Sequence, residues 1–221
     1  MRLALFDLDH TLIPFDSGMA WTQFLVSAGV LPPNAESEYL GYCRQYVDGT
    51  LDIHAMHRAT VAPLARFPRP LLAQWGREFE LRVAERVPDS MRTLVQRHLD
   101  EGDLCAIVTA TTRFVAEPFA RLFGVPHLVA TEAATDGDAP DGALTGEIAG
   151  LPCYREHKRD RVVQWLTERG IGPLGGFDRS WFYSDSASDL PLLQAVTDPV
   201  VVRPDAKLLA HAQRAGWRVI D

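Results

Sequence analysis

The sequence has few cysteines and no long hydrophobic segment. Its three cysteines, Cys43, Cys105 and Cys153, lie far apart, and no two of them form a Cys-x-x-Cys pair. Neither a disulfide framework nor a cysteine zinc site is therefore expected, and a reducing cytoplasm is the predicted location. No apolar run is long enough to span a bilayer, and Asp7 and Asp9 interrupt the one at the amino terminus, so we expect neither a membrane span nor a signal peptide.

Positive charge is also scarce. Lysine and arginine together number 22, and aspartate and glutamate number 29, which gives a formal net charge of −7. This acidic excess argues against nucleic acid as the main partner. An acidic enzyme with an anionic substrate must reverse that charge locally, with a metal ion or with a few cations placed at the site. The hydrophobic share of 47% is that of an ordinary globular protein.

The chain begins with a short apolar segment and continues with helical periodicity. Leu3–Phe6 is apolar and bounded by charge, as expected of a buried strand. Between residues 15 and 87, four amphipathic segments follow one another with no strand between them. Their breaks fall at 29–33, 48–49 and 67–70. This part of the chain is predicted to form a small helical bundle inserted after the first strand.

From residue 88 onward, predicted helices and strands alternate. Strands are expected at 104–109, 127–131, 181–184 and 200–202, with an edge strand at 218–220. A hairpin around 144–148 is expected within the stretch 132–154, which is rich in Gly, Asp and Pro. The alternation predicts a parallel sheet with helices on both faces.

Polar residues stand where the predicted strands end. Asp7 and Asp9 follow the first strand one residue apart, and in extended backbone their carboxylates would face one side, close enough to share a divalent cation. Further polar residues fall at the same edge of the sheet, namely Thr11, Thr109, Lys158, Asp185 and Asp189. Each has another interpretation when taken singly. Asp-x-Asp also suits a polar turn, Thr109 and the later aspartates suit helix caps, and Lys158 suits the surface.

Taken together, these residues resemble the four motifs of the haloacid dehalogenase superfamily. The motifs are Asp7-Leu8-Asp9-His10-Thr11, Thr109, Lys158 and Ser184-Asp185-Ser186-Ala187-Ser188-Asp189. The resemblance implies a metal-dependent phosphohydrolase with an α/β fold. Its Rossmann-like doubly wound parallel sheet core would comprise residues 1–14 and 88–221, and an inserted helical-bundle cap would comprise residues 15–87. The cap position and Asp-Leu-Pro-Leu-Leu at 189–193 are most similar to the phosphoserine phosphatase-like branch, which includes bacterial histidinol-phosphatases.

The resemblance implies that one aspartate is the nucleophile, that a second aspartate acts first as an acid and then as a base, and that the site binds a metal ion. Asp7 would attack the phosphorus and form an aspartyl-phosphate. Asp9 would protonate the leaving alkoxide and then activate the hydrolytic water. Dehalogenating members lack this second aspartate, so phosphate chemistry is favoured. Mg²⁺ would offset the charge of the phosphate dianion, held by the carboxylates of Asp7 and Asp185 and the backbone carbonyl of Asp9.

The same resemblance assigns the remaining motif residues to binding and support. Lys158 would pair with the nucleophile or the transferring phosphoryl group. Thr109 and the backbone N–H groups near it, including that of Ala110, would bind phosphate oxygens. Thr11 and Asp189 would support these groups, Asp189 by orienting a metal-bound water or Lys158.

Other functions explain part of the same pattern. A receiver-like signalling domain also surrounds a phosphorylated Asp with acidic residues, Thr or Ser, and Lys, but it carries that Asp later in the chain and lacks a helical insert of this length. A metal-dependent glycosyltransferase would account for Asp-x-Asp but not for the second acidic pair or Lys158. A phosphoserine phosphatase or a phosphotransferase of the same superfamily shares the first half-reaction, so both stay open.

The substrate is expected to be a small soluble phosphate ester, handled by a monomer or homodimer without nucleic acid or membrane. Phosphoserine phosphatases usually have Ser-Gly-Gly where this chain has Thr109-Ala110-Thr111, so an amine-bearing or cationic ester such as histidinol phosphate is favoured. Asp16 lies near enough to the catalytic loop to meet a substrate amine, whereas Arg113 could bind a carboxylate and favour phosphoserine. Three aromatic residues could line the entrance or form bundle core: Trp21, Tyr42 and Tyr46.

Overall fold

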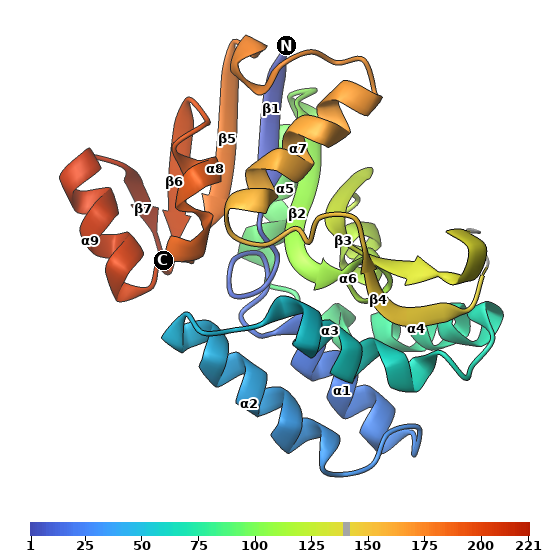
Figure 1. The fold of residues 1–221 in the computed structure, drawn as a ribbon. Helices are drawn as coiled ribbons and strands as arrows, with labels where there is room; N and C mark the ends of the chain where they lie inside the picture. Colours follow the sequence, from blue (N-terminus) through green and yellow to red (C-terminus); the bar gives the residue numbers. More distant parts are fainter. Residues whose placement is uncertain (139–141) are drawn as a thin grey trace.

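The structure, a computed structural model, describes residues 1–138 and 142–221 (Figure 1). Within these residues the strands form one sheet in the order β4-β3-β2-β1-β5-β6-β7. Neighbouring strands run parallel, except that β3 and β4 are antiparallel. The strands are β1 (Arg2–Phe6), β2 (Leu104–Thr112), β3 (His127–Thr135), β4 (Leu144–Ala149), β5 (Arg179–Ser184), β6 (Asp198–Val202) and β7 (Arg218–Ile220).

Strand β1 lies in the middle of the sheet because its side chains are apolar on both faces. All residues from Leu3 to Phe6 are fully buried, as in parallel sheets covered on both sides. β1 pairs with β2 on one side and with β5 on the other. Asp7 and Asp9 therefore follow at the centre of the sheet edge, between the ends of two other strands.

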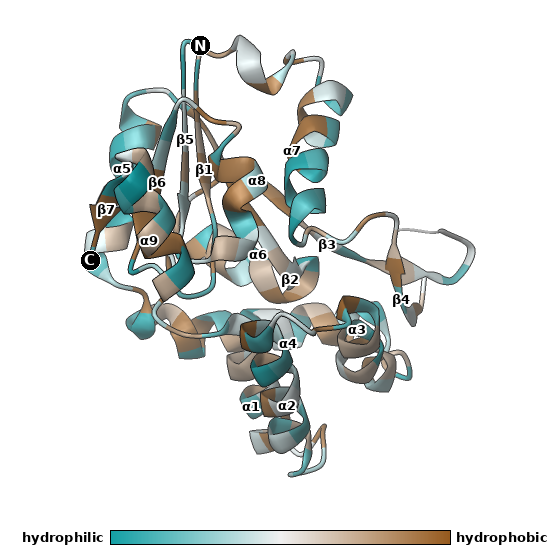
Figure 2. Cartoon of the chain, turned by 60° about the vertical axis from the view of Figure 1, so that its left-hand side comes forward, coloured by the Kyte–Doolittle hydropathy of each residue, from teal (hydrophilic) through white to brown (hydrophobic). Residues whose placement is uncertain are grey.

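Helices cover both faces of the sheet, as the alternating pattern predicted. α5 (Asp89–Asp100) and α6 (Arg113–Leu122) pack on one face, whose core includes Met91, Val95 and Phe119. α7 (Glu156–Glu168), α8 (Leu190–Leu193) and α9 (Ala206–Ala215) lie on the other, with Val162, Leu192 and Leu208 in its core. Figure 2 shows that the helices mix hydrophobic and hydrophilic residues, as expected of elements with one buried side.

Four helices occupy the chain between β1 and α5, at the carboxyl end of the sheet (Figure 1). They are α1 (Ser17–Ser27), α2 (Ala35–Asp48), α3 (Ile53–Val61) and α4 (Arg69–Val83). The side chains of Asp16 and Asp52 cap the first turns of α1 and α3, and Pro70 lies in the first turn of α4. The division into a core of 1–14 and 88–221 and a cap of 15–87 stays a prediction. No helix in the described parts of the chain is long and apolar enough to cross a membrane.

Aromatic side chains join the four helices to the sheet-bearing part. The ring of Trp21 in α1 lies 5.2 Å from Phe79 of α4 and 6.1 Å from Phe114 of α6. Phe79 also meets Phe119 of α6 edge to face, with ring centroids 5.8 Å apart. Each such pair adds about 0.5–1.5 kcal/mol beyond simple burial. Trp21 thus belongs to the core of the bundle and does not line an entrance.

Strands β2 and β3 extend past their predicted carboxyl ends, and both extensions involve non-local pairing. β2 continues to Thr112, and its register against β3 shifts between Val108 and Thr112. Residues 109–111 therefore lie opposite a single residue of β3, as in a β-bulge. β3 continues to Thr135 because it pairs there with β4, the strand expected as part of a hairpin. The stretch 132–154 includes residues 139–141, which lie outside the described residues.

Candidate active site

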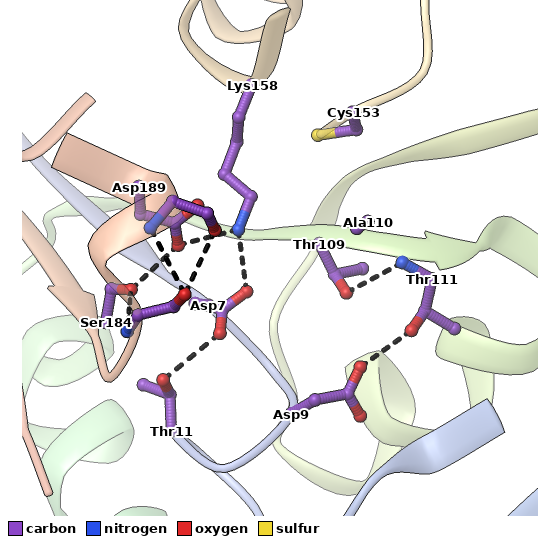
Figure 3. Close-up of polar contacts among 12 residues, drawn as sticks. Asp7, Asp9, Thr11, Thr109, Ala110, Thr111, Cys153, Lys158, Ser184 and Asp189 are labelled. Carbon is purple, nitrogen blue, oxygen red and sulfur yellow. Dashed lines mark hydrogen bonds and ion pairs between the residues drawn. The ribbon is translucent and has the colours of Figure 1, made fainter. Parts of the chain in front are cut away.

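A buried ion cluster stands at the end of β1 (Figure 3). Nζ of Lys158 donates to Oδ1 of Asp7 at 2.9 Å and to Oδ2 of Asp189 at 2.7 Å. The three residues are 3%, 7% and 1% exposed, respectively. Burial alone would lower the pKa of the Lys158 ammonium, but Asp189 and Asp7 outweigh it and hold that pKa well above its ordinary value. Lys158 is therefore a buried cation and not a surface lysine.

Helix α7 presents Lys158 to the cluster on its inner face. Lys158, Val162 and Trp165 are buried and follow the spacing of one helix face. Lys158 is the third residue of α7, so its side chain stands beside the end of the sheet. On the opposite side of the cluster, Oγ of Ser184 donates to Oδ2 of Asp189 at 2.7 Å. Asp189 is thus held by groups from two separate parts of the chain.

The hydroxyl of Thr11 joins the carboxylates of Asp7 and Asp185. Its Oγ1 lies 3.1 Å from Oδ2 of Asp7 and 3.0 Å from Oδ1 of Asp185, and it accepts a hydrogen bond from the backbone N–H of Asp185. A hydroxyl carries one proton, so it can donate to only one of these carboxylates at a time. Burial and then the charge of Asp7 raise the pKa of Asp185 to about 8. The two carboxylates therefore repel each other.

This donor set fits a divalent cation. The described residues contain no group of three or more His, Cys, Asp or Glu side chains placed to hold a metal. The carboxylates of Asp7 and Asp185 would therefore share the ion with neutral oxygens, as Mg²⁺ accepts when it keeps several waters. In the described part of the chain, the buried Oδ1 of Asp189 has no hydrogen-bond partner, so it could accept from such a water.

Asp9 stands apart from this cluster and faces α1 and the end of β2. Its Oδ1 accepts from the backbone N–H of Ser17 at 2.6 Å, and its Oδ2 accepts from Oγ1 of Thr111 at 2.7 Å. Burial, and next the charge of Asp16, raise the pKa of Asp9 to about 6. Asp9 can therefore carry a proton near neutral pH, which a general acid must do.

The threonine hydroxyl groups of the β2 bulge also lie at the carboxyl edge of the sheet. Oγ1 of Thr109, a residue only 1% exposed, accepts from the backbone N–H of Thr111 at 3.1 Å. The carbonyl of Ala110 accepts from Oγ1 of Thr131 at 2.8 Å. Figure 3 places Thr109 and Ala110 at the same end of the sheet as Asp7 and Lys158. The predicted phosphate-binding residues and the predicted carboxylates thus meet at one edge.

Arg113 was predicted to bind substrate, but the structure does not bring it to this cluster. Its Nε lies 2.9 Å from both carboxylate oxygens of Glu132, and an NH2 group donates to the carbonyl of Leu128. Both partners lie on β3, and they line a separate groove of about 780 Å³ between α6 and α7. We therefore correct the expectation that Arg113 binds a substrate carboxylate, because its guanidinium is committed to an ion pair elsewhere.

Asp16 and Tyr46 lie where the four helices meet the site. Oδ1 of Asp16 accepts from the backbone N–H of Met19 and from the hydroxyl of Tyr39. Asp16 thus caps α1 and also stands near enough to Asp9 to raise its pKa. The hydroxyl of Tyr46, on α2, donates to Oγ of Ser186 in the loop after β5 at 2.9 Å. Tyr42 is half-buried.

The sequence interpretation gave no role to three groups that the structure brings to the site. They are the hydroxyl of Thr111, the backbone N–H of Ser17 and the hydroxyl of Ser184. Ser17 and Thr111 hold the carboxylate of Asp9, and Ser184 holds that of Asp189. Thr111 and Ser184 lie within the motif segments, so the rule that strand ends carry the site would have included them. Ser17 gives no sequence signal, because its backbone makes the contact.

Comparisons with known proteins identify the family of the chain. The family model described as haloacid dehalogenase-like hydrolase matches residues 4–194. A histidinol-phosphatase of Neisseria meningitidis serogroup C is 39% identical over 222 residues, which cover 100% of this chain and 98% of the relative. Phosphoserine phosphatase SerB1 of Mycobacterium tuberculosis is 28% identical over 228 residues, covering 99% of this chain and 70% of that protein.

A solved structure extends the comparison to the fold. The crystal structure of a protein with unknown function from Bordetella pertussis Tohama I is similar with a TM-score of 0.89 and 43% identity, and the match covers 100% of this chain and 98% of the other. The chain therefore belongs to the haloacid dehalogenase-like hydrolase family, which confirms the predicted family, the predicted α/β fold and the prediction of a phosphatase-type enzyme.

Proposed function

We propose that this enzyme is a magnesium-dependent phosphomonoesterase that acts through an aspartyl-phosphate on Asp7. One observation carries the proposal: Asp7 is buried at the end of the central strand, held by the ammonium of Lys158 and the hydroxyl of Thr11. A carboxylate so oriented, with a cation beside it, is suited to attack a phosphate that would otherwise repel it. Neither a receiver domain nor a glycosyltransferase accounts for a family match over residues 4–194.

In the first half-reaction a carboxylate oxygen of Asp7 attacks phosphorus, and the bond from phosphorus to the leaving oxygen breaks. Asp9 gives its proton to that oxygen, so the product leaves as a neutral alcohol. In the second half-reaction Asp9 takes a proton from water, the water oxygen bonds to phosphorus, and the aspartyl-phosphate is cleaved to inorganic phosphate. Lys158 and the hydroxyl of Thr109 stabilise charge on the phosphoryl oxygens in both.

The metal fits the same site. Asp7 and Asp185 would hold Mg²⁺ with their carboxylates and Asp9 with its backbone carbonyl. When bound, the ion offsets the negative charge that the phosphate and the two carboxylates bring together. Thr11 keeps the two carboxylates near one another, and Asp189 keeps Lys158 charged and in place. Cytoplasmic location and a monomeric or homodimeric state stay predictions.

Removal of divalent cations tests the proposal directly. With p-nitrophenyl phosphate as substrate, chelation should reduce turnover at least about a hundredfold, because several kcal/mol of charge stabilisation are lost. Added Mg²⁺ should restore the rate. Far-ultraviolet circular dichroism before and after chelation controls for unfolding. Full activity after exhaustive chelation would contradict the metal-dependent mechanism.

Lys158→Ala should reduce kcat on the order of a hundredfold or more, since it removes one electrostatic stabiliser of the transition state. It also leaves Asp7 and Asp189 without their shared cation, which costs about 3–5 kcal/mol of stability for a buried pair. Lys158→Met fills the volume, so a similar loss of kcat in this variant would assign the effect to the missing charge and not to a cavity. Lys207→Ala, at an exposed lysine of α9, is the matched control. A change in kcat below about threefold would exclude Lys158 from the reaction.

We further propose that the substrate is a small phosphate ester with an amine or cationic body, such as histidinol phosphate. Support comes from the carboxylate of Asp16, which lies beside Asp9, where the leaving group must be protonated. Arg113 is engaged by Glu132 and offers no anchor for the carboxylate of phosphoserine. The relative named histidinol-phosphatase is also more similar to this chain than the relative named phosphoserine phosphatase.

Asp16→Asn tests the selection of an amine. The amide can still cap α1, so the fold should persist while the charge is lost. We expect kcat/KM for histidinol phosphate to fall about tenfold more than that for glycerol phosphate, a difference of about 1.4 kcal/mol. Loss of the Asp16 charge also lowers the pKa of Asp9, but this affects both alkyl esters alike. Asp52→Asn, at the cap of α3, is the matched control.

Two outcomes would count against the substrate proposal in different ways. If wild type prefers phosphoserine to histidinol phosphate by about tenfold or more, the substrate class is wrong. If Asp16→Asn leaves the ranking of the three esters unchanged, Asp16 is not the selector, even when histidinol phosphate remains the best substrate.

A further inference from the structure

The loop between β6 and α9 contacts both loops that carry the proposed metal ligands. One guanidinium nitrogen of Arg203, the residue directly after β6, donates to the backbone carbonyl of Thr11 at 2.7 Å and to that of His10 at 3.1 Å. These carbonyls belong to the segment between Asp9 and the helices. Charge-assisted bonds of this kind are stronger than neutral ones. Arg203 therefore fixes the backbone of His10 and Thr11, in the loop that follows β1.

Asp205, two residues later, holds the second loop. Its backbone N–H donates to the carbonyl of Asp185 at 2.8 Å, and its Oδ2 accepts from the backbone N–H of Ala187 at 2.7 Å. Its Oδ1 caps α9 by accepting from the N–H of Leu208 at 2.8 Å. One carboxylate thus ties the loop after β5 to the start of a helix.

Two strained backbone positions lie at the same place. Among the described residues other than glycine, positive φ occurs at His10 (58°), Arg155 (52°) and Arg203 (42°). Such conformations cost about 1–3 kcal/mol each and persist only where surrounding contacts enforce them. His10 and Arg203 are joined by one of the hydrogen bonds described above, so the two strained residues stabilise one another's position.

We propose that Arg203 and Asp205 are positioning residues that set the separation of the two carboxylates that hold the metal. Asp7 and Asp185 stand on different strands, and Thr11 is the side chain that bridges them directly. Arg203 fixes the backbone of Thr11, and Asp205 fixes the backbone of Asp185. Neither residue touches the reacting atoms. The inference rests on the proposed function, because it assumes that these carboxylates bind Mg²⁺.

The test is Mg²⁺ affinity, measured by isothermal titration calorimetry on the full chain without substrate. Residues that orient metal ligands typically contribute 10- to 100-fold to affinity, so Arg203→Ala should weaken Mg²⁺ binding about tenfold. At saturating Mg²⁺ its kcat should recover most of the loss, because the catalytic groups remain. Arg214→Ala, at an exposed arginine of α9, changes the net charge equally and should leave the affinity unchanged.

Two further variants keep the test decisive if Arg203→Ala does not fold. Arg203→Lys keeps the charge and a donor group on a shorter side chain, so its affinity should fall between wild type and alanine. Asp205→Asn retains one side-chain acceptor oxygen for two donors, so it must give up the bond to Ala187 or the cap of α9. It should also weaken Mg²⁺ binding, whereas a loss of stability alone would lower the melting temperature and leave the affinity of the folded protein unchanged.

Failure of this inference differs from failure of the proposed function. Suppose that wild type binds Mg²⁺ and that the Arg203 and Asp205 variants bind it within about twofold of wild type. The positioning role is then wrong, and the phosphatase proposal still stands. An equal loss in Arg214→Ala would also overturn the positioning role, because charge alone would then be the cause. Wild type that binds no Mg²⁺ would overturn both.

Discussion

Asp7→Asn is expected to abolish phosphatase turnover, by a factor of at least about 10⁴, while leaving the fold intact. The amide oxygen can still accept from Lys158 and keeps the volume of the carboxylate. It cannot act as the nucleophile, so no covalent phosphoenzyme can form. Steady-state turnover of p-nitrophenyl phosphate measures the loss, and acid-quenched mass spectrometry should detect a phosphorylated Asp7 in wild type and none in the variant.

Stability should change little in Asp7→Asn, and this separates the prediction from simple misfolding. Burial and then the charge of Asp7 raise the pKa of Asp185, so removal of that charge relieves a repulsion. Asp100→Asn, at an exposed residue of α5, makes the same charge change away from the site and should keep full activity. Turnover by Asp7→Asn within about tenfold of wild type would rule out the aspartyl-phosphate mechanism.

Asp9→Asn should slow the reaction by about 10²–10⁴-fold with alkyl phosphates, the range expected of a lost general acid. Aryl phosphates leave as stable phenolates, need less protonation, and should be affected much less. The asparagine can keep the contacts to Ser17 and Thr111, so the geometry is retained. The comparison is kcat/KM for glycerol phosphate and for p-nitrophenyl phosphate in both proteins. Equal losses with the two esters would contradict the acid–base role.

The pH profile gives a second measurement of the same group. Because burial and Asp16 raise the pKa of Asp9 to about 6, the acid form is lost as pH rises through that value. In wild type, kcat/KM for an alkyl ester should therefore decline above about pH 6. In Asp9→Asn this decline should disappear, since the amide does not titrate in the range. A decline that persists in the variant would assign it to another group.

The position of the site could be predicted because it depends on local pattern. Leu3–Phe6 is a short apolar run of the kind that forms a buried strand, and carboxyl ends of parallel strands share one edge. These two facts place Asp7, Asp9 and Asp185 together before any contact is known. The four helices of residues 15–87 also follow from local periodicity and caps. Asp16, Asp52 and Pro70 mark helix starts that the structure contains.

What could not be predicted depends on partners distant in the sequence. Lys158 is buried only because two carboxylates from other elements meet it, and the first turn of a polar helix does not reveal them. Arg113 was expected at the site because it follows Thr109 closely, but its guanidinium forms an ion pair with Glu132 on the next strand. The bulge at 109–111 depends on the register of β3, which no local pattern specifies.

The strand order also determines how the site is lost when the protein opens. The proposed nucleophile Asp7 follows β1, the proposed phosphate-binding hydroxyl of Thr109 lies on β2, and the loop with Asp185 follows β5. These are three adjacent strands in the middle of the sheet. Amide hydrogens of central strands exchange with solvent mainly through global unfolding, whereas edge strands such as β4 and β7 fray at lower free energy. The catalytic groups are therefore anchored on strands that are expected to open last. Local fluctuations at either edge of the sheet leave these anchors in place, and heat inactivation should coincide with cooperative melting of the whole core.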